Sequence, residues 1–387
     1  MNVHICFIAD EYPLPGLVIG GIGSFLFNIC SKLVERNIQV TIIGFYKVEE
    51  DYVETNGINI HCLKNSQGGR FLKWYYKSDK IQKKIEEVHA KNPISYVEGG
   101  DMDLAFVKKI PGIKYGIRMH GGHHFYSKYE NKPLNKWKAF QEKLSYKKAD
   151  VFIGVSQFVI DETAKVLNLD GREVYLINYP INTEKFKPVD NIAVEKYSLM
   201  FAGTVCEKKG IRQLILALPA ILEKYPQTTL NIYGKDWFFP DGSSYINYLK
   251  KDIIPQLQEL AFQNIIFHGP VSIREIPRKY AAAHVCVFPS HMETLGLVAP
   301  EAMAVEKLVV FTKEGPGPEV IEPYKTGLLC DPHDPEDIAA KIIWYFDHEN
   351  ETSEIGRNAR QSVLNKFGLD HVVEQNLQFL NKLINNK

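Results

Sequence analysis

The sequence predicts an α/β fold made of two Rossmann-like β/α/β domains, each a parallel sheet covered by helices on both faces. Short apolar strands alternate with helical segments along most of the chain, which is the pattern of a parallel sheet. This alternation runs in two successive series, and a stretch with two prolines, YPINTEKFKP at 179–188, separates them. The length of 387 residues suits two domains of ordinary size.

Each series supplies the elements of one domain. In the first we expect strands at 3–9, 39–45, 58–63, 94–98, 114–119 and 151–155, with helices at 24–36 and 80–90. In the second we expect strands at 198–202, 228–233, 265–268, 285–289 and 308–311, with helices at 211–224, 244–260, 273–281 and 335–347. Two more helical segments follow, at 354–366 and 371–384. We place the domain boundary between residues 183 and 184.

Composition excludes several classes of protein. The net charge is zero and 45% of the residues are hydrophobic, which argues against a dedicated nucleic-acid binder. No apolar run is long enough to span a bilayer, and the first residues, MNVHICFIAD, indicate a core strand rather than a signal peptide. The six cysteines are scattered without metal-ligand spacing, which favours buried free thiols in a cytoplasmic protein.

One region is basic and aromatic. Residues 64–148 contain 19 Lys or Arg against 8 Asp or Glu. Its segments 70–91 and 128–148 mix lysines with aromatic side chains that include Phe71, Trp74, Tyr75, Tyr76, Trp137 and Phe140. Such helices can lie on an anionic membrane surface. The alternative is a solvated helix face whose aromatic residues belong to the core, and the sequence leaves both open.

A motif with two glutamates lies in the second half of the chain. In FPSHMETLGLVAPEAMA, at 288–304, seven residues separate Glu293 from Glu301. Pro300 suits the first turn of a helix, so we expect Glu301 near a helix start and Glu293 on the loop before it. Free N–H groups at a helix start can bind an anion, and the carboxylates can accept hydrogen bonds from hydroxyls. A phosphate-bearing sugar would meet both requirements.

This motif resembles the donor site of glycosyltransferase family 4, whose members are retaining, metal-independent enzymes of the GT-B fold. The two glutamates, EAMA, and the Gly/Pro loop ending in Glu319 carry the resemblance. It implies two domains facing across a cleft, with the acceptor on residues 1–183 and the nucleotide sugar on residues 184–368. It also implies that a last helix, 369–387, packs back on the first domain. No metal or other cofactor is expected.

The resemblance also implies roles for individual residues. Glu301 would hold the ribose hydroxyls and Glu293 the hydroxyls of the donor sugar. The remaining residues of the donor site lie in four loops and comprise Gly21, Gly23, Gly203, Thr204, Lys209, Gly269, Val271, Gly296, Leu297 and Val298.

The glycine-rich loop after the first strand is not a dinucleotide fingerprint. Gly20, Gly21 and Gly23 precede a helix, but they begin ten residues after the strand, and Leu26 stands where a third glycine is required. Their backbone N–H groups can still approach a phosphate. A loop that is merely flexible is the alternative.

Histidines and aspartates form two further candidate sites. MHGGHHF contains His120, which the resemblance places beside the donor sugar, and His123 and His124, which we expect on the acceptor side or in structural roles. No local carboxylate or cysteine completes a metal site. Asp101 and Asp103 imitate a metal-binding Asp-x-Asp pair, but they follow a strand, so helix capping is favoured and acceptor contact comes second.

FAGTVCEKKG, at 201–210, departs from the family pattern. Gly203, Lys209 and Gly210 match it, but Thr204 stands where an arginine is usual. A hydroxyl offers one hydrogen bond and no charge, and charge-assisted bonds are about twice as strong. Either Lys208 or Arg118 compensates, or lysine and backbone dipoles suffice.

The sequence therefore predicts a retaining hexosyl-type glycosyltransferase in cell-envelope polysaccharide, lipopolysaccharide or glycolipid synthesis. Its partners would be a nucleotide-sugar donor, a glycan or lipid-linked acceptor and an anionic membrane surface. The catalytic residues would be His120, Glu293 and Lys209, with Lys209 stabilising the leaving diphosphate. A non-catalytic sugar-nucleotide-binding subunit, a sugar-nucleotide epimerase and a nucleotide-linked oxidoreductase are the alternatives.

Overall fold

Two units make up the chain. The structure, a computed structural model, describes residues 3–14, 20–46, 50–53, 56–64, 73–257 and 259–385. One unit comprises residues 1–180 and 369–387, and the other comprises residues 181–368. The two crossings between them run side by side, because the Ile181 N–H donates a hydrogen bond to the Phe367 carbonyl oxygen at 2.7 Å. Phe71 and residues 15–19 of the glycine-rich loop lie outside the described residues.

The first unit is built on a sheet with the strand order β3-β4-β2-β1-β5-β6-β7-β8, parallel except for the antiparallel edge strand β3. The strands are β1 (His4–Ile8), β2 (Gln39–Phe45), β3 (Glu50–Val53), β4 (Asn59–Leu63), β5 (Tyr96–Gly99), β6 (Lys114–Met119), β7 (Val151–Gly154) and β8 (Glu173–Leu176). The helices are α1 (Gly21–Glu35), α2 (Lys73–Lys91), α3 (His123–Tyr129), α4 (Lys136–Lys148), α5 (Gln157–Ala164) and α14 (Leu369–Asn385).

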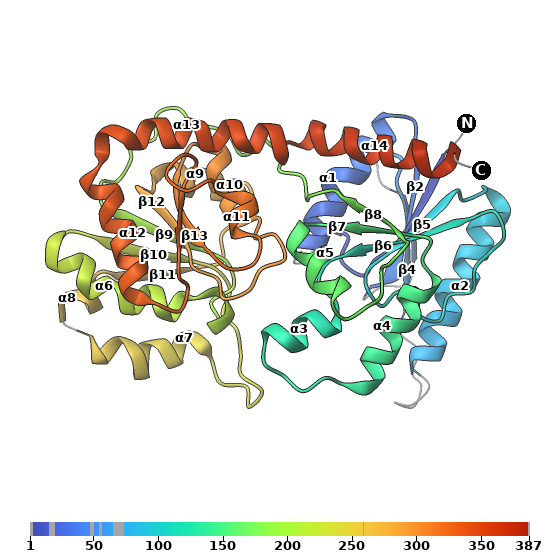
Figure 1. The fold of residues 1–387 in the computed structure, drawn as a ribbon, viewed down its shortest axis with the longest axis horizontal. Helices are drawn as coiled ribbons and strands as arrows, with labels where there is room; N and C mark the ends of the chain where they lie inside the picture. Colours follow the sequence, from blue (N-terminus) through green and yellow to red (C-terminus); the bar gives the residue numbers. More distant parts are fainter. Residues whose placement is uncertain are drawn as a thin grey trace. The chain divides into compact units, whose positions relative to one another are not determined.

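Helices cover both faces of this sheet. The connection from β1 through α1 to β2 runs in one direction along the sheet, and that from β4 through α2 to β5 runs in the other. Because such crossovers are right-handed, α1 and α2 lie on opposite faces, as Figure 1 shows. All residues of β1 and all but the first of β2 are buried, which explains why these strands are apolar along their whole length.

The second unit has a fully parallel sheet with the order β11-β10-β9-β12-β13-β14. Its strands are β9 (Ser198–Ala202), β10 (Thr229–Tyr233), β11 (Ile265–Gly269), β12 (Val285–Phe288), β13 (Leu308–Thr312) and β14 (Leu328–Cys330). Its helices are α6 (Ile211–Lys224), α7 (Tyr245–Tyr248), α8 (Glu259–Gln263), α9 (Ile276–Ala282), α10 (Val298–Ala304), α11 (Gly317–Val320), α12 (Pro335–Asp347) and α13 (Glu349–Lys366).

Some elements differ from the sequence-based expectation. The single helix expected at 244–260 is wrong: α7 continues into a π-helical segment, Leu249–Ile253, and a 3-10 turn, Ile254–Gln256, before α8 begins at Glu259. Pro255 lies in the 3-10 turn, where it lacks the N–H that a continuous helix needs. The edge strands β3, β8 and β14 were not expected because they have only three or four residues.

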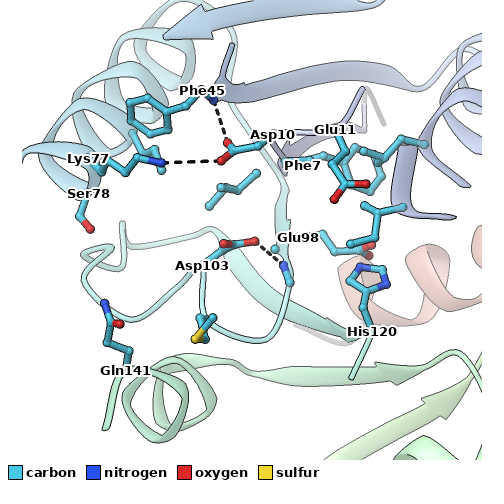
Figure 2. A pocket seen from close by; sticks show the side chains of 18 of the residues that line it. Phe7, Asp10, Glu11, Phe45, Lys77, Ser78, Glu98, Asp103, His120 and Gln141 are labelled. Carbon is cyan, nitrogen blue, oxygen red and sulfur yellow. Dashed lines mark hydrogen bonds and ion pairs between the residues drawn. The ribbon is translucent and has the colours of Figure 1, made fainter. Parts of the chain in front are cut away.

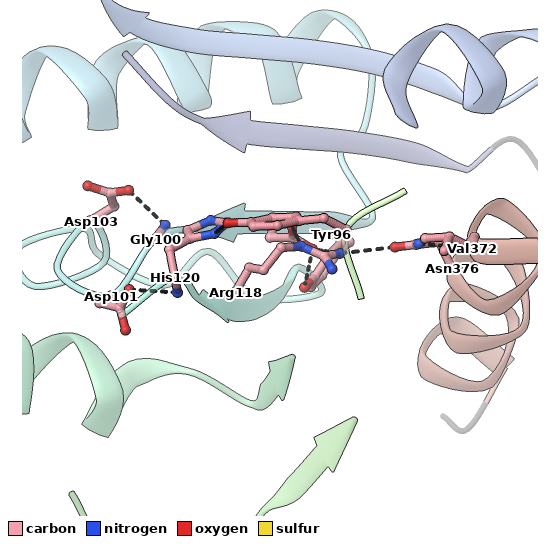
Figure 3. A network of polar contacts seen from close by, with 10 residues as sticks. Tyr96, Gly100, Asp101, Asp103, Arg118, His120, Val372 and Asn376 are labelled. Atoms are coloured by element: carbon pink, nitrogen blue, oxygen red, sulfur yellow. Dashed lines mark hydrogen bonds and ion pairs between the residues drawn. The ribbon is translucent and has the colours of Figure 1, made fainter. Parts of the chain in front are cut away.

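A buried polar network attaches α14 to the first sheet (Figure 3). The Arg118 side chain, 1% exposed, donates from Nε to Oε1 of Glu98 at 2.7 Å and from Nη2 to Oδ1 of Asn376 at 2.9 Å. Tyr96 donates its hydroxyl hydrogen to Oε2 of the same glutamate at 3.1 Å. Beside the network, the Phe379 ring of α14 packs edge-on against Tyr96. Arg118 is therefore committed to holding the C-terminal helix in the first unit.

Candidate functional site

The second unit has its topological switch point between β9 and β12. After β9 the chain adds β10 and then β11 toward one edge of the sheet, whereas β12 lies next to β9 on its other flank and is followed by β13 and β14 toward the opposite edge. In open parallel sheets, ligands bind outside the carboxyl ends of the strands at such a point. The loops at this position are 203–210, after β9, and 289–297, after β12. They contain half of the residues that the sequence proposed for donor binding, namely Gly203, Thr204, Lys209, Glu293, Gly296 and Leu297.

A glycine brings these two loops together. Gly210 adopts a left-handed φ of 69°, and a Cβ there would lie 1.8 Å from the carbonyl oxygen of Pro289. Any other side chain would therefore push the loops apart. The contact is continued by the His291 N–H, which donates to the Lys208 carbonyl oxygen at 2.9 Å.

Lys209 and Glu293 form an ion pair across the two loops. The Lys209 Nζ lies 2.5 Å from Oε1 of Glu293, and their side chains are 24% and 10% exposed. Lys209 ends the short 3-10 turn η1 (Glu207–Lys209), which directs it toward the second loop. The pair therefore combines a cation that can meet a phosphate with a carboxylate that can accept from hydroxyls.

The second loop turns sharply before α10. Gly296 has a φ of +80°, and a Cβ there would lie 2.6 Å from the Phe311 ring. Leu297 caps α10 and Val298 is its first residue. Pro300 lies in the first turn, which is where the sequence predicts a helix start. Within this turn the Ala299 N–H donates to the Gly296 carbonyl oxygen at 3.1 Å and the Glu301 N–H to the Leu297 carbonyl oxygen at 2.9 Å, and Pro300 has no N–H. The positive end of the helix dipole still favours an anion there.

Glu301 is half-buried in the first turn of α10. Its Oε2 accepts a hydrogen bond from the Tyr280 hydroxyl at 3.2 Å. Burial raises the pKa of Glu301 to about 7, while the Tyr280 hydrogen bond and the charge of Lys185 act in the opposite direction. Glu301 thus changes charge near neutral pH.

Two more of the proposed donor residues, Gly269 and Val271, lie at and just after the carboxyl end of β11. Gly269 ends the strand with a φ of +74°, its carbonyl oxygen accepts from the Gly234 N–H at 2.9 Å, and Val271 follows it, half-buried. After β9, Gly203 has a φ of +141° and Thr204 is half-buried. Of the two cations considered as substitutes at position 204, Arg118 is excluded by its buried pairing in the first unit.

The first unit has a pocket at its own switch point, between β1 and β5 (Figure 2). The volume is about 360 Å³. Acidic residues that line it are Asp10, Glu11, Glu98 and Asp103, and its other lining includes Trp74, Lys77, Phe106, His120 and Gln141. Sequence reasoning missed Asp10 and Glu11. Their position directly after the first strand, at the carboxyl edge of a parallel sheet, is the signal that could have identified them.

His120 lines this pocket and is held by two contacts. Its backbone N–H donates to Oδ2 of Asp101 at 3.0 Å, and Nδ1 of its imidazole is hydrogen-bonded to the Tyr179 hydroxyl. Burial lowers the pKa of His120 to about 3, and the charge of Arg118 contributes in the same direction. The imidazole is therefore neutral at physiological pH.

Asp101 and Asp103 differ in their surroundings. Asp101 is buried, and its oxygens accept from the His120 N–H at 3.0 Å and from the Tyr146 hydroxyl at 2.8 Å. Asp103 accepts from the Gly100 N–H at 2.7 Å and is exposed toward the pocket. Residues 101–106 form turns rather than the helix that the capping interpretation required. In this geometry Asp101 positions His120, and Asp103 is the member of the pair that a ligand can reach.

His123 and His124 lie at the start of α3, where each has a protein partner. The Asn135 N–H donates to Nε2 of His123 at 2.9 Å, and Nδ1 of His124 lies 2.5 Å from Oε2 of Glu142. Within the described ranges, no group of three or more His, Cys, Asp or Glu side chains is arranged to hold a metal ion.

Gly21 and Gly23 lie inside α1, not in the loop before it. The helix begins at Gly21, three residues earlier than the sequence suggests, and Gly20 is its N-cap in an extended conformation. A Cβ on Gly20 would lie 2.9 Å from Oε2 of Glu11. A carboxylate thus already lies close to this helix start.

The sequence matches glycosyltransferases in both halves. The family model "Glycosyl transferases group 1" matches residues 182–362, and "Glycosyltransferase Family 4" matches residues 19–185. An uncharacterized glycosyltransferase, MJ1607 of Methanocaldococcus jannaschii, is 24% identical over 403 residues, with 96% of each chain covered.

Solved structures of glycosyltransferases show the same fold. Sucrose-phosphate synthase from Thermosynechococcus elongatus superposes with a TM-score of 0.84 over 100% of both chains at 20% identity. Anabaena HepE in complex with UDP-glucose gives a TM-score of 0.75 at 18% identity, covering 98% of this chain and 99% of that one. The chain therefore belongs to glycosyltransferase family 4, and its two Rossmann-like domains are those of the GT-B fold.

Proposed function

We propose that this glycosyltransferase transfers a hexose from a nucleotide-diphosphate sugar to a glycan or lipid-linked acceptor with retention of configuration. The observation that carries the proposal is the Lys209–Glu293 ion pair at the switch point, next to the start of the helix that contains Glu301. The HepE structure with UDP-glucose supports the donor class, because that protein has the same fold.

In the proposed reaction, the bond between the anomeric carbon and the diphosphate oxygen breaks and the acceptor oxygen bonds to the same face of that carbon. The acceptor proton passes to the departing phosphate. Negative charge develops on the diphosphate, and Lys209 together with the first N–H groups of α10 would stabilise it. Glu293 would hold the sugar hydroxyls and Glu301 the ribose hydroxyls, and His120 would orient the sugar.

Lys209 and backbone dipoles would balance the negative charge of the diphosphate, without a metal ion. Gly21 is left out of the phosphate site, because Glu11 lies close to the start of α1 and would repel an anion. Thr204 would donate one hydrogen bond where an arginine is usual, so Lys209 carries more of the electrostatic stabilisation.

A thermal-shift screen tests the donor class directly. The purified chain is heated with a panel of UDP-, GDP-, ADP- and TDP-sugars, and a bound donor raises the melting temperature by mass action. We expect one nucleotide series to stabilise the protein and to be hydrolysed slowly without an acceptor. Stabilisation with neither hydrolysis nor transfer would instead support a non-catalytic sugar-nucleotide-binding subunit.

We further propose that the protein acts at an anionic membrane surface in cell-envelope glycan synthesis. Where α2 and α4 begin, four aromatic side chains are exposed: Tyr75 by 53%, Tyr76 by 41%, Trp137 by 44% and Phe140 by 52%. The rings of Trp74 and Trp137, 5.4 Å apart, join the two helices into one aromatic surface, and lysines of α4 flank it. No described helix is long and apolar enough to cross a bilayer.

Vesicle sedimentation tests membrane binding. We expect the chain to sediment with anionic vesicles and not with neutral ones, since the surface combines aromatic and basic side chains. Trp137→Ala with Phe140→Ala should reduce the bound fraction severalfold. Phe238→Ala is the matched control, because Phe238 is 58% exposed in the second unit. Equal loss in both variants, or no sedimentation of the unaltered chain, would contradict the proposal.

A further inference from the structure

The pocket of the first unit is lined by both carboxylates and aromatic rings. Asp10, Glu11 and Asp103 line it, as do Trp74 and Phe106, whose ring centroids are 4.2 Å apart. Its volume of about 360 Å³ is at the small end of the range for ligand pockets, roughly 300–1,000 Å³. A pocket of this size and composition suits a small polar ring with one apolar face.

The carboxylates retain acceptor capacity toward the pocket. Asp10 accepts from the Phe45 N–H through Oδ1 at 2.8 Å, and Lys77 Nζ lies 3.8 Å from its Oδ2. Asp103 accepts from Gly100 through Oδ2. Each carboxylate has about four lone-pair sites, so both can also accept from ligand hydroxyls.

The same pocket is poor in positive charge. Among the described residues that line it, Lys77 is the one Lys or Arg, and its Nζ is near Asp10 and 4.4 Å from the centroid of the Phe45 ring. His120 is neutral, and Arg118, which does not itself line the pocket, is ion-paired with the lining residue Glu98. A phosphate here would face several carboxylates with little compensation.

His120 adds a hydrogen-bond donor to this lining. The Tyr179 side chain is buried and its hydroxyl has His120 Nδ1 as its hydrogen-bond partner among the described residues. A buried O–H must be satisfied, so Tyr179 donates to Nδ1, and the proton of the neutral imidazole then resides on Nε2. The neutral imidazole thus adds an N–H donor to the carboxylate acceptors of this lining, a set that matches sugar hydroxyls.

We propose that this pocket binds the acceptor through a sugar ring or polyol that carries no phosphate. The inference rests on the proposed function, since it names the acceptor class of that reaction. Hydroxyls of the ring donate to Asp103 and Glu11, and its apolar face packs on Trp74. Acceptors with a phosphate on this ring are rejected by the carboxylates.

Binding to the full chain, measured by saturation-transfer NMR and titration calorimetry without donor, tests the proposal. The ligands are methyl glycosides of common hexoses, short oligosaccharides that end in them, and the same hexoses as 6-phosphates. We expect at least one uncharged series to bind, with its phosphate at least tenfold weaker. Asp103→Asn should weaken the uncharged ligand about tenfold, because a hydrogen bond to a charged group is lost.

Two variants test whether the carboxylate charges, rather than a change in folding, cause the weaker binding of phosphates. Glu11→Gln combined with Asp103→Asn removes two charges without changing shape. It should therefore reduce the difference in binding affinity between the uncharged sugar and its phosphate. Asp161→Asn is the control, because Asp161 lies on α5 outside the pocket lining. Tighter binding of the phosphate by the unaltered chain, or no binding of any ligand at tens of millimolar, would overturn the inference.

The donor screen distinguishes this inference from the proposed function. If uncharged sugars bind but no nucleotide sugar stabilises the chain, the proposed transfer reaction fails and the pocket remains a sugar site. If nucleotide sugars bind and are hydrolysed while the pocket prefers phosphates, the acceptor class is wrong and the transfer reaction stands.

Discussion

Lys209 and Glu293 face each other across the switch point of the second sheet with 2.5 Å between Nζ and Oε1. The pair is held by elements distant in sequence, since Lys209 ends η1 and Glu293 follows β12. The lysine is therefore ion-paired with a carboxylate at the place where, in the proposed complex, the diphosphate would bind. A donor would have to share or displace this contact, which links sugar binding to phosphate binding.

Replacing Lys209 tests its role in stabilising the leaving group. We expect Lys209→Ala to lower kcat by about a hundredfold, because a preorganised charge at the developing anion is lost. Steady-state transfer or donor hydrolysis measures it. Lys224→Ala is the control: Lys224 forms an exposed ion pair with Asp347 on the same unit. Unchanged turnover in Lys209→Ala would remove the lysine from the reaction.

Glu293→Gln should separate sugar contact from nucleotide contact. The amide keeps the shape but loses the charge that pairs with Lys209 and, in the proposed donor complex, would hold the sugar hydroxyls, so transfer should fall at least tenfold. Binding of the free nucleoside diphosphate, measured by calorimetry, should change less than threefold. Weaker nucleotide binding with full turnover would assign Glu293 to the nucleotide and Glu301 to the sugar.

The local geometry of the candidate site in the second unit follows from the sequence more directly than that of the pocket in the first unit, because its residues are close in sequence. Gly296, Pro300 and Glu301 lie within a few residues of one another, and a glycine turn followed by a helix start is decided by local chemistry. Tyr280, which contacts Glu301, comes from a different helix, α9, so no spacing in the sequence connects them.

The strand β8 and the turn at Asp101 and Asp103 were not predicted, because the sequence near them lacks a local signal. β8 has only four residues, each exposed or half-buried, so it lacks the apolar run that identifies the central strands. The pair Asp101 and Asp103 suggested a helix cap, but Asp101 accepts from the distant Tyr146 hydroxyl, and Asp103 accepts from the Gly100 N–H three residues before it in a turn. The contact to Tyr146 depends on which elements become neighbours, and local propensity does not specify that.

Glu301 predicts a pH dependence of donor affinity. Its pKa of about 7 means that the carboxyl is protonated below neutrality and ionised above it. In the proposed donor complex, ribose hydroxyls would donate more strongly to the carboxylate than to the protonated carboxyl, so binding would favour the ionised form and affinity should rise as pH increases through 7. The dissociation constant of the correct nucleotide sugar should be up to about tenfold larger at pH 6 than at pH 8.

Glu301→Gln is the control for that dependence. The amide does not titrate, so its affinity should be weaker but nearly flat between pH 6 and 8. The raised pKa also affects folding: the native state holds this proton more tightly than the unfolded state, so this group's contribution to the free energy of unfolding falls as pH rises from about 4.5 to 7. Parallel curves for the glutamate and glutamine forms would contradict the assignment.

Tyr179→Phe should change the tautomer of His120 without charging it. Without the hydroxyl donor, Nδ1 can carry the proton, and the fraction of imidazole rings with the proton on Nε2 then falls. Nitrogen chemical shifts of the imidazole would report a larger fraction of the Nδ1–H form. We expect kcat to fall about tenfold with unchanged nucleotide binding. Tyr175→Phe is the control, since that hydroxyl contacts exposed Glu173.

The Arg118–Glu98 pair predicts how the C-terminal helix contributes to stability. Arg118→Met leaves Glu98 as a buried charge without its main partner, so the free energy of unfolding should fall by about 3 kcal/mol in a urea titration. Asn376→Ala removes one hydrogen bond from the same guanidinium and should cost about 1–2 kcal/mol. Combining Arg118→Met with Glu98→Leu should recover most of the loss, because no charge then remains buried. If the double variant is as unstable as Arg118→Met alone, the loss comes from packing against Phe25 and α14 rather than from the unpaired carboxylate.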